Sequence, residues 1–290
     1  MGVMTGVKQY TDRHWMTADG LKLHYRDYAG PKSRPPILCI PGLTRNARDF
    51  SALAQRLAGD WRVICVELRG RGDSAYAKDV STYSPLSYVA DLELLIAALK
   101  LKRLVIFGSS LGGILTMLLT ASKPGRVQAA LINDIGPDMD PRGLGRIKGH
   151  LGKSQSWPTW VHAARWMSET QGHAFPSNDL VDWVAFAKRV CRLSAQGRVV
   201  LDYDMAIAEP LREETAPFDL WPLVAALGDT PVTLLRGALS DMLTEAAAKR
   251  MTKMLPFGRL VTVQGVGHAP MLDEPEAVRA IDALLKRAIA

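Results

Sequence analysis

Hydrophobic residues in the first half of the chain alternate between two patterns. Short, almost continuously apolar runs predict strands that are buried on both faces. These runs occupy residues 37–40, 62–68, 104–107 and 127–132. Between them, apolar residues recur every three or four positions, which predicts amphipathic helices. The predicted helices cover residues 46–58, 83–100 and 111–122. Repeated alternation of buried strand and helix is typical of a parallel sheet with helices on both faces.

The same alternation returns near the C-terminus. There the pattern predicts two further strands, each followed by a helix; the four elements cover residues 231–235, 244–255, 259–263 and 275–288. Near the N-terminus, residues 16–28 hold Ala-Asp-Gly between two alternating runs, which predicts a hairpin. We therefore expect one α/β core assembled from residues 1–136 and 222–290.

Residues 137–221 interrupt this pattern and predict a mostly helical insertion after one strand of the sheet. The segment has no convincing buried strand and several stretches of helical periodicity. Five of the seven tryptophans fall in it: Trp157, Trp160, Trp166, Trp183 and Trp221. We interpret it as a cap on the core, not as a separate domain on a linker.

The net charge of +7 raises the question of a polyanionic partner. The basic stretch 142–200 is followed directly by the acidic stretch 201–220, so positive charge is not gathered into one footprint. Binding to nucleic acid requires such a footprint. We expect a mixed-sign surface, a small-molecule substrate and no nucleic-acid partner, with a homo-oligomer left open.

Cysteine usage and the hydropathy of the termini favour a cytoplasmic protein. Cys39 and Cys65 lie inside apolar runs, and the three cysteines show no metal-ligand spacing. The N-terminus lacks the charged and apolar regions of a signal peptide. Residues 104–122 are uncharged and long enough to suggest a membrane span, but their glycines and serines favour a strand followed by a helix.

Gly108-Ser109-Ser110-Leu111-Gly112 is the strongest chemical signal in the sequence. This G-x-S-x-G pattern stands between a predicted strand and a predicted helix, where it makes a sharp, crowded turn that requires small neighbours. Such a turn exposes the central serine hydroxyl beside the free N–H groups of the helix N-terminus. Ser110 is therefore the predicted nucleophile, and Ser109 is out of register.

A serine nucleophile requires a base, and the base requires an acid that orients it. Among the six histidines, His268 follows a C-terminal strand in a glycine-rich loop, so we predict it as the base; the other five are expected to be structural or to lie on the surface. Asp241 lies in the loop after the strand 231–235 and is the preferred acid. Asp134 follows the strand 127–132 at the same edge of the sheet and is a rival.

An oxyanion formed at the substrate carbonyl needs two backbone N–H donors. The first is the N–H of Leu111, the residue after the nucleophile. The second candidate is the N–H of Leu43, because Pro41-Gly42-Leu43 follows the first parallel strand, where the chain turns closely past the predicted site. No ligand cluster calls for a metal, and the chemistry requires no organic cofactor.

Together these motifs resemble the α/β-hydrolase superfamily over the whole chain. They are the G-x-S-x-G turn, the Arg-Gly-Arg-Gly-Asp-Ser loop at 69–74, Ser240-Asp241 and Gly267-His268, and they stand in the expected order. The resemblance implies the α/β-hydrolase fold, with a mostly parallel sheet and a helical cap inserted after the sixth strand. The branch that looks most similar holds capped carboxylesterases, enol-lactonases and meta-cleavage-product hydrolases, which cleave carbon–carbon bonds.

Within that superfamily the residues favour hydrolysis of a small or medium carboxylic ester or lactone through an acyl-enzyme. Carbon–carbon hydrolases often place Trp after the catalytic histidine, whereas Ala269 and Pro270 follow here. Carbon–carbon bond hydrolysis stays open as the alternative, because arginines of the cap could bind the carboxylate of such a substrate. These arginines are Arg142, Arg146, Arg165, Arg189 and Arg192. A cofactor-free perhydrolase and a non-catalytic small-molecule receptor are further alternatives. Haloalkane dehalogenases and epoxide hydrolases use an Asp nucleophile, which Ser110 argues against.

Overall fold

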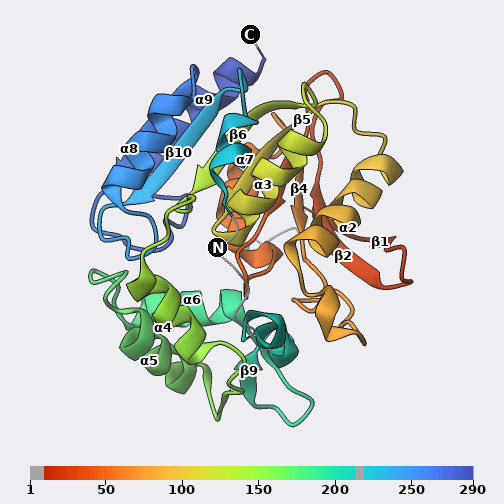
Figure 1. Cartoon of the computed structure of the whole chain (residues 1–290). Coiled ribbons are helices and arrows are strands. Elements are labelled where there is room, and N and C mark those ends of the chain that lie inside the picture. The colour runs from red at the N-terminus through yellow and green to blue at the C-terminus, as the bar shows by residue number, and fades with distance from the viewer. Residues whose placement is uncertain (1–9, 213–218, 290) are drawn as a thin grey trace, which may run out of the picture.

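Eight strands form one twisted sheet in the computed structural model, which describes residues 10–212 and 219–289 (Figure 1). Their order across the sheet is β1-β2-β4-β3-β5-β6-β10-β11. The first two pairings are antiparallel and the others are parallel, so the sheet is mostly parallel as predicted. The strands are β1 (Tyr10–Met16), β2 (Lys22–Tyr28), β3 (Ile37–Ile40), β4 (Val63–Val66), β5 (Leu104–Ser109), β6 (Val127–Asn133), β10 (Val232–Gly237) and β11 (Gly258–Val263). Residues 1–9, 213–218 and 290 lie outside the described part.

The central strands are apolar on both faces because helices cover both faces. In β3, Leu38 and Ile40 point into one hydrophobic cluster, and Ile37 and Cys39 point into another on the opposite side. All four side chains are fully buried. This follows from the period of two in a strand, which sends neighbouring side chains to opposite faces.

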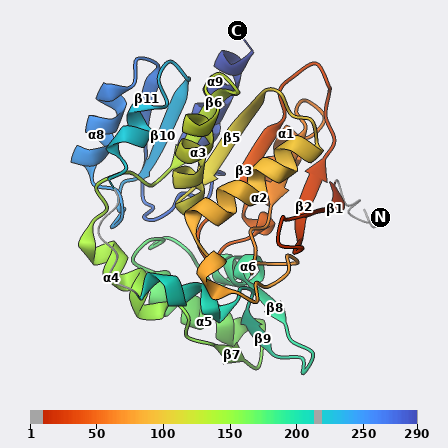
Figure 2. The same cartoon turned by 45° about the vertical axis from the view of Figure 1, so that its right-hand side comes forward.

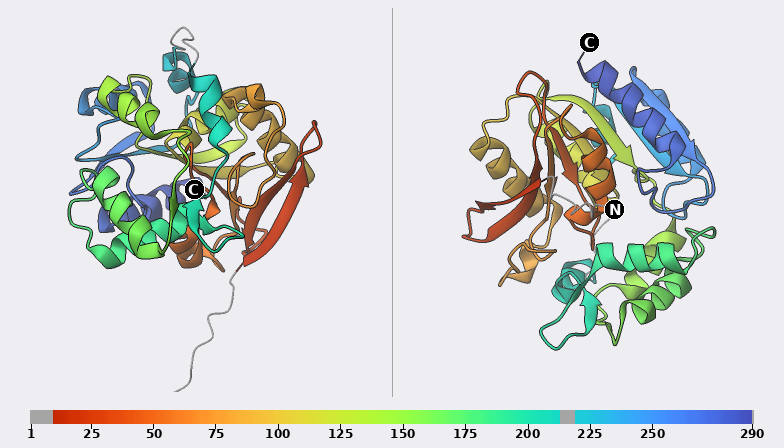
Figure 3. Two further views of the ribbon diagram at one scale, coloured as in Figure 1. Left: turned by 90° about the horizontal axis from the view of Figure 1, so that it is seen from below. Right: turned by 180° about the vertical axis from the view of Figure 1, so that it is seen from behind.

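Helices form a layer on each side of the sheet (Figures 2 and 3). One side holds α2 (Pro85–Ala98), α3 (Leu111–Ser122) and α8 (Glu245–Met254), with the short α7 (Trp221–Ala225) against α3. The other side holds α1 (Ser51–Leu57) and α9 (Pro275–Ala288). The predicted helix at 46–58 is divided into a 3₁₀ turn η1 (Ala47–Phe50) and α1. Another 3₁₀ turn, η2 (Val80–Thr82), precedes α2.

The chain leaves the core after β6 and returns to it at α7, and residues 137–211 lie beyond the ends of the parallel strands (Figure 1). This segment holds α4 (Pro141–His150), α5 (Trp160–Gln171), α6 (Leu180–Val190) and the 3₁₀ helix η3 (Met205–Leu211). It also holds a small antiparallel sheet of β7 (Ser156–Trp157), β9 (Val199–Leu201) and β8 (Cys191–Leu193). The sequence did not indicate this sheet, because strands of two or three residues are too short to produce a periodic signal.

Residues 137–211, called the cap below, are fastened to the core by polar contacts with the residues around η1. The side chains of Asn46 and Arg48 both donate to the backbone oxygen of Arg189, at 3.1 and 2.9 Å. Arg48 also pairs with the buried carboxylate of Asp202 at 2.5 Å. These contacts fix the cap over the site. Within the described residues, no helix has the length and apolar character needed to cross a membrane.

Candidate active site

Ser110 stands on the tight turn that the G-x-S-x-G pattern predicts. Its φ of +51° is in the left-handed region, a conformation that costs energy for a residue with a side chain. The flanking Gly108 and Gly112 cannot be replaced by residues with a side chain. A Cβ atom at Gly108 would lie 2.2 Å from the Gly112 backbone oxygen, and one at Gly112 would lie 2.0 Å from the Ile40 oxygen. The strand, the turn and α3 thus pack so closely that Ser110 is held at the start of the helix.

His268 contacts Ser110, as predicted from the sequence. Its Nε2 lies 2.9 Å from Ser110 Oγ, although 158 positions separate the two residues. The loop that carries His268 follows β11 and packs closely on β10, since a Cβ atom at Gly237 would lie 2.4 Å from the Gly267 oxygen. Ser110 and His268 therefore have the geometry of a hydroxyl and the base that takes its proton.

The acid that contacts His268 is Asp134 and not Asp241, which corrects the preference from the sequence. Asp134 Oδ2 lies 2.8 Å from His268 Nδ1, and the carboxylate is fully buried. It accepts two further hydrogen bonds, from the N–H of Gly237 at 2.9 Å and from the hydroxyl of Ser240 at 2.6 Å. The loop after β10, where we expected the acid, thus supplies donors to the acid that follows β6.

Asp241 forms a different contact, with the cap. Its two carboxylate oxygens accept hydrogen bonds from Nε and Nη2 of Arg146, at 2.7 and 2.9 Å. Partial burial raises the pKa of Asp241, but the hydrogen bonds and charge of Arg146 outweigh this effect and the net pKa is lowered. Asp241 is therefore an ionised partner of the cap arginine. The sequence could not separate the two acids, because both follow neighbouring strands at one edge of the sheet.

The residues predicted to supply the oxyanion donors flank Ser110. Leu111 is the first residue of α3, where backbone N–H groups have no partner within the helix. The turn at Gly42 runs against Ser110, since a Cβ atom at Gly42 would lie 3.5 Å from Ser110 Cβ. The backbone oxygen of Leu43 accepts a 2.8 Å hydrogen bond from the fully buried Arg71. This bond fixes the orientation of the turn, and the donor roles of Leu43 and Leu111 stay predictions.

Asn133 was not identified from the sequence, which placed the end of its strand one residue earlier. Its side-chain amide donates to Ser109 Oγ at 3.0 Å and to the Pro270 oxygen at 2.9 Å. Its backbone oxygen accepts from the N–H of Ser110 at 2.9 Å. Asn133 therefore ties the nucleophile turn to the loop that carries the histidine. An asparagine at the end of a strand is too common a pattern to have signalled this role.

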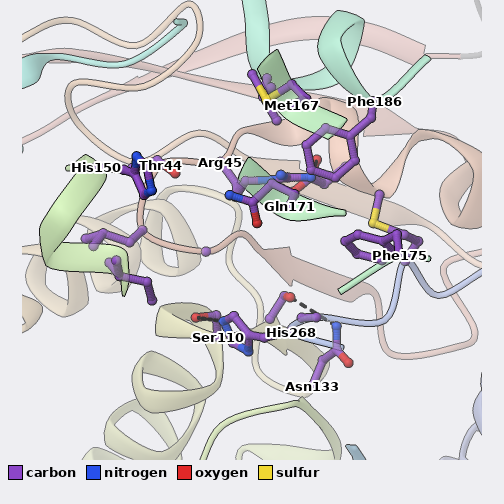
Figure 4. A pocket seen from close by; sticks show the side chains of 18 of the residues that line it. Thr44, Arg45, Ser110, Asn133, His150, Met167, Gln171, Phe175, Phe186 and His268 are labelled. Carbon is purple, nitrogen blue, oxygen red and sulfur yellow. Dashed lines mark hydrogen bonds and ion pairs between the residues drawn. The ribbon is translucent and has the colours of Figure 1, made fainter. Parts of the chain in front are cut away.

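A cavity of about 200 Å³ opens beside Ser110 and His268, between the core and the cap (Figure 4). In Figure 4, Phe175 and Phe186 lie on one side of it, and Thr44 and His150 lie on the other. Of the five tryptophans in the predicted insertion, Trp166 lines the cavity, whereas Trp157 and Trp183 are buried in the hydrophobic cluster inside the cap. The cap contributes aliphatic and aromatic side chains to the cavity lining: Ile147, Leu151, Trp166, Met167, Phe175, Phe186, Val190 and Leu201. His150, expected to be structural or exposed, also lines the cavity.

Away from the cavity, a buried polar network supports the turn that precedes α1. The Glu67 carboxylate is fully buried and accepts hydrogen bonds from the N–H groups of Ala47 and Asp73, at 3.2 and 2.6 Å. It also contacts His24 Nδ1 at 3.0 Å. His24, Glu67 and Asp73 are close enough together to share a metal ion. The N–H donors already around the Glu67 carboxylate support a structural role instead, because they bind the oxygens that a metal would need.

His24 in this network gives the free energy of unfolding a predictable dependence on pH. Burial lowers the pKa of His24, but the hydrogen bonds and charges of the neighbouring acids Glu67, Asp12 and Asp73 together outweigh burial, and the net pKa is raised above 6.5. The folded chain then binds the proton more tightly than the unfolded chain, so this stabilisation is complete below pH 6.5 and is lost as pH rises through the folded pKa. We expect His24→Gln to flatten that decline in urea unfolding measured at several pH values.

His162→Gln is the matched control for that experiment, because His162 is an exposed histidine whose ring contacts Thr159 within the cap. The control should keep the wild-type slope. A wild-type slope in His24→Gln as well would show that another group causes the decline.

Comparisons with known proteins agree with the fold. Residues 37–281 match the model of a family described as the alpha/beta hydrolase family. The 3-hydroxybutyrate-oligomer hydrolase of Cupriavidus necator is 30% identical over 267 residues, which cover 89% of this chain and 90% of that protein. A crystal structure of an alpha/beta hydrolase from Novosphingobium aromaticivorans is 52% identical, with a TM-score of 0.94, and the match covers 97% of this chain and 100% of that one. A putative hydrolase from Rickettsia typhi is 26% identical with a TM-score of 0.86, covering 96% and 99%.

Proposed function

Because the chain belongs to the alpha/beta hydrolase family, we propose that it is a serine hydrolase that cleaves carboxylic esters through an acyl-enzyme. One observation carries this proposal: the continuous contact from Ser110 Oγ through His268 to the buried carboxylate of Asp134. A hydroxyl, an imidazole and a carboxylate in this order are the groups that nucleophilic acyl transfer requires.

In the first half of the proposed reaction, Ser110 Oγ attacks the ester carbonyl carbon while His268 takes the hydroxyl proton. The carbonyl oxygen becomes an oxyanion, which the N–H groups of Leu43 and Leu111 stabilise. When the tetrahedral intermediate collapses, the carbon–oxygen bond to the alcohol breaks and His268 returns the proton to the leaving oxygen. Asp134 stabilises the imidazolium and holds its tautomer throughout.

In the second half, water takes the place of the alcohol. His268 removes a proton from the water, whose oxygen attacks the acyl carbon of the Ser110 ester. Collapse of the second tetrahedral intermediate releases the carboxylic acid and returns the proton to Ser110 Oγ. The sum of the two halves is one ester and one water converted to one acid and one alcohol, with no redox change.

We propose a small or medium ester or lactone as the substrate. The cavity of about 200 Å³ is below the range of about 300–1,000 Å³ typical of drug-sized ligands. An oligomer of a hydroxy acid, the substrate named for the Cupriavidus relative, is joined by ester bonds. The carbon–carbon alternative retains one supporting observation, because the cap arginine Arg146 lines the cavity.

Labelling with a fluorophosphonate tests the proposed nucleophile, because this probe reacts with an activated serine. We expect mass spectrometry of digested protein to place the label on Ser110, and we expect turnover of short-chain p-nitrophenyl esters. Ser109→Ala is the matched control, since it removes the neighbouring hydroxyl and should label normally. Labelling without ester turnover would favour carbon–carbon cleavage, and a folded protein that does not label would overturn the proposal.

We also propose that the protein works in the cytoplasm. Its three cysteines, Cys39, Cys65 and Cys191, are buried and free, as expected in a reducing compartment. Burial raises the pKa of the Cys39 and Cys191 thiols, which keeps them protonated and unreactive.

A further inference from the structure

Helix α4 brings two basic side chains to one wall of the cavity. Arg146 and His150 are four residues apart, so they lie on the same face of the helix. Both line the cavity that opens onto Ser110. The ring of His150 also packs edge-on against Trp166, with 6.1 Å between the ring centres. These contacts give the wall a defined position.

The guanidinium of Arg146 is held in place and still has donors to offer. Asp241 occupies Nε and Nη2 and is itself outside the cavity lining. Nη1 makes no hydrogen bond with any residue that the structure describes. Arg146 therefore lines the cavity with three of its five N–H groups unpaired among the described residues, and its counter-ion Asp241 lies outside the cavity lining.

Arg45 also lines the cavity, but its carboxylate partner lies in a different place from that of Arg146. Arg45 is also held through Nε and Nη2 by an aspartate, Asp49, at 2.5 and 2.8 Å. Arg45 and Asp49 both line the cavity, so a ligand there meets the positive and the negative charge together. Arg45 also packs over the ring of Phe186, 4.7 Å from its centre. Arg146 thus lines the cavity without its carboxylate partner, whereas Arg45 lines it together with Asp49.

We infer that the wall formed by Arg146 and His150 binds a free carboxylate of the substrate. The substrate class is then an ester that carries a carboxylate several atoms from the scissile bond, such as a short linear ester of a hydroxy acid. Phe175, Phe186 and Met167 form the apolar part that receives the acyl chain. Asp241 acts as a positioning residue through Arg146. This inference rests on the proposed ester hydrolase function.

A pair of matched esters tests the inference: 3-(butyryloxy)butanoate, which carries a carboxylate, and 3-(butyryloxy)butanamide, which is its neutral isostere. For the wild-type protein we expect kcat/KM to favour the carboxylate by roughly tenfold, a factor that one charge-assisted hydrogen bond can supply. Arg146→Gln should abolish this preference, with the loss appearing in KM for the carboxylate ester. Asp241→Asn should reduce it in the same way, because the guanidinium then loses its support.

Arg142→Gln is the matched control, since Arg142 is an exposed arginine one turn earlier on α4 that pairs with Asp140 and does not line the cavity. It removes the same charge and should keep the wild-type preference. Equal kcat/KM for the two esters in the wild-type protein would overturn the inference. This measurement needs no variant. A preference that survives in folded Arg146→Gln would also overturn the inference. Failure of the proposed function is distinguishable, because then neither ester is cleaved and Ser110 is not labelled.

Discussion

Replacing Asp134 by asparagine is expected to lower kcat for p-nitrophenyl butyrate by about 10⁴-fold, the loss typical of this change in a serine–histidine–aspartate triad. The carboxylate of Asp134 is fully buried and lies 2.8 Å from His268 Nδ1. An amide at this position cannot stabilise the imidazolium, and its NH₂ group favours the wrong tautomer of the histidine. The steady-state rate with this ester measures the effect directly.

Asp241→Asn is the control that shows whether the loss of kcat is specific to Asp134. It makes the same change of carboxylate to amide in the loop after the neighbouring strand, on the acid that pairs with Arg146. We expect kcat for the neutral ester to fall far less than in Asp134→Asn. A loss of 10⁴-fold in Asp241→Asn with a mild effect in Asp134→Asn would restore the assignment that the sequence favoured. Circular dichroism of both variants separates lost catalysis from lost folding.

Removal of the nucleophile is expected to have the largest effect. Ser110→Ala should reduce kcat by about 10⁶-fold, to the residual level that binding and oxyanion stabilisation provide. Because the triad residues act as a unit, adding Asp134→Asn to this variant should cause little further loss. Single-turnover rates and labelling in parallel give the measurement.

Ser109→Ala provides the control for Ser110→Ala. The Ser109 hydroxyl accepts a hydrogen bond from Asn133, whereas the Ser110 hydroxyl contacts His268. We expect this variant to retain turnover within about tenfold, as a change beside the site that leaves the triad intact. Ester turnover by Ser110→Ala close to that of the wild-type protein would disprove the nucleophile assignment.

The core could be predicted from the sequence because burial on both faces leaves strong local signals. The run at 37–40 has the same bounds as β3, and the helix at 111–122 has the same bounds as α3. The contact between Ser110 and His268 could be predicted for a similar reason, since each residue depends on glycines that a tight turn or a close approach demands. These requirements act over a few residues and are therefore visible in the sequence.

The acid could not be predicted in the same way, because its identity depends on contacts between distant segments. Asp134 and Asp241 both stand at the carboxyl edge of the sheet, and the difference lies in what surrounds each carboxylate. Gly237 and Ser240 donate to Asp134, whereas Asp241 meets Arg146, which is 95 positions away in the chain. The residues next to Asp134 and Asp241 in the sequence do not indicate which distant residue each carboxylate contacts.

The position of Asp134, one residue after the end of β6, also limits how this protein can be re-engineered. The proposed catalytic acid stands where the chain departs for the cap, and the loop of the proposed base His268 is tied to the cap by the N–H of Gly267, which donates to the Ala174 oxygen at 2.6 Å. The cap, which lines the cavity, is therefore attached to the core close to the proposed acid and base. A chimaera that takes its cap from another hydrolase should be spliced beyond Asp134 and should keep an equivalent of Ala174, so that the graft alters the pocket without displacing the triad.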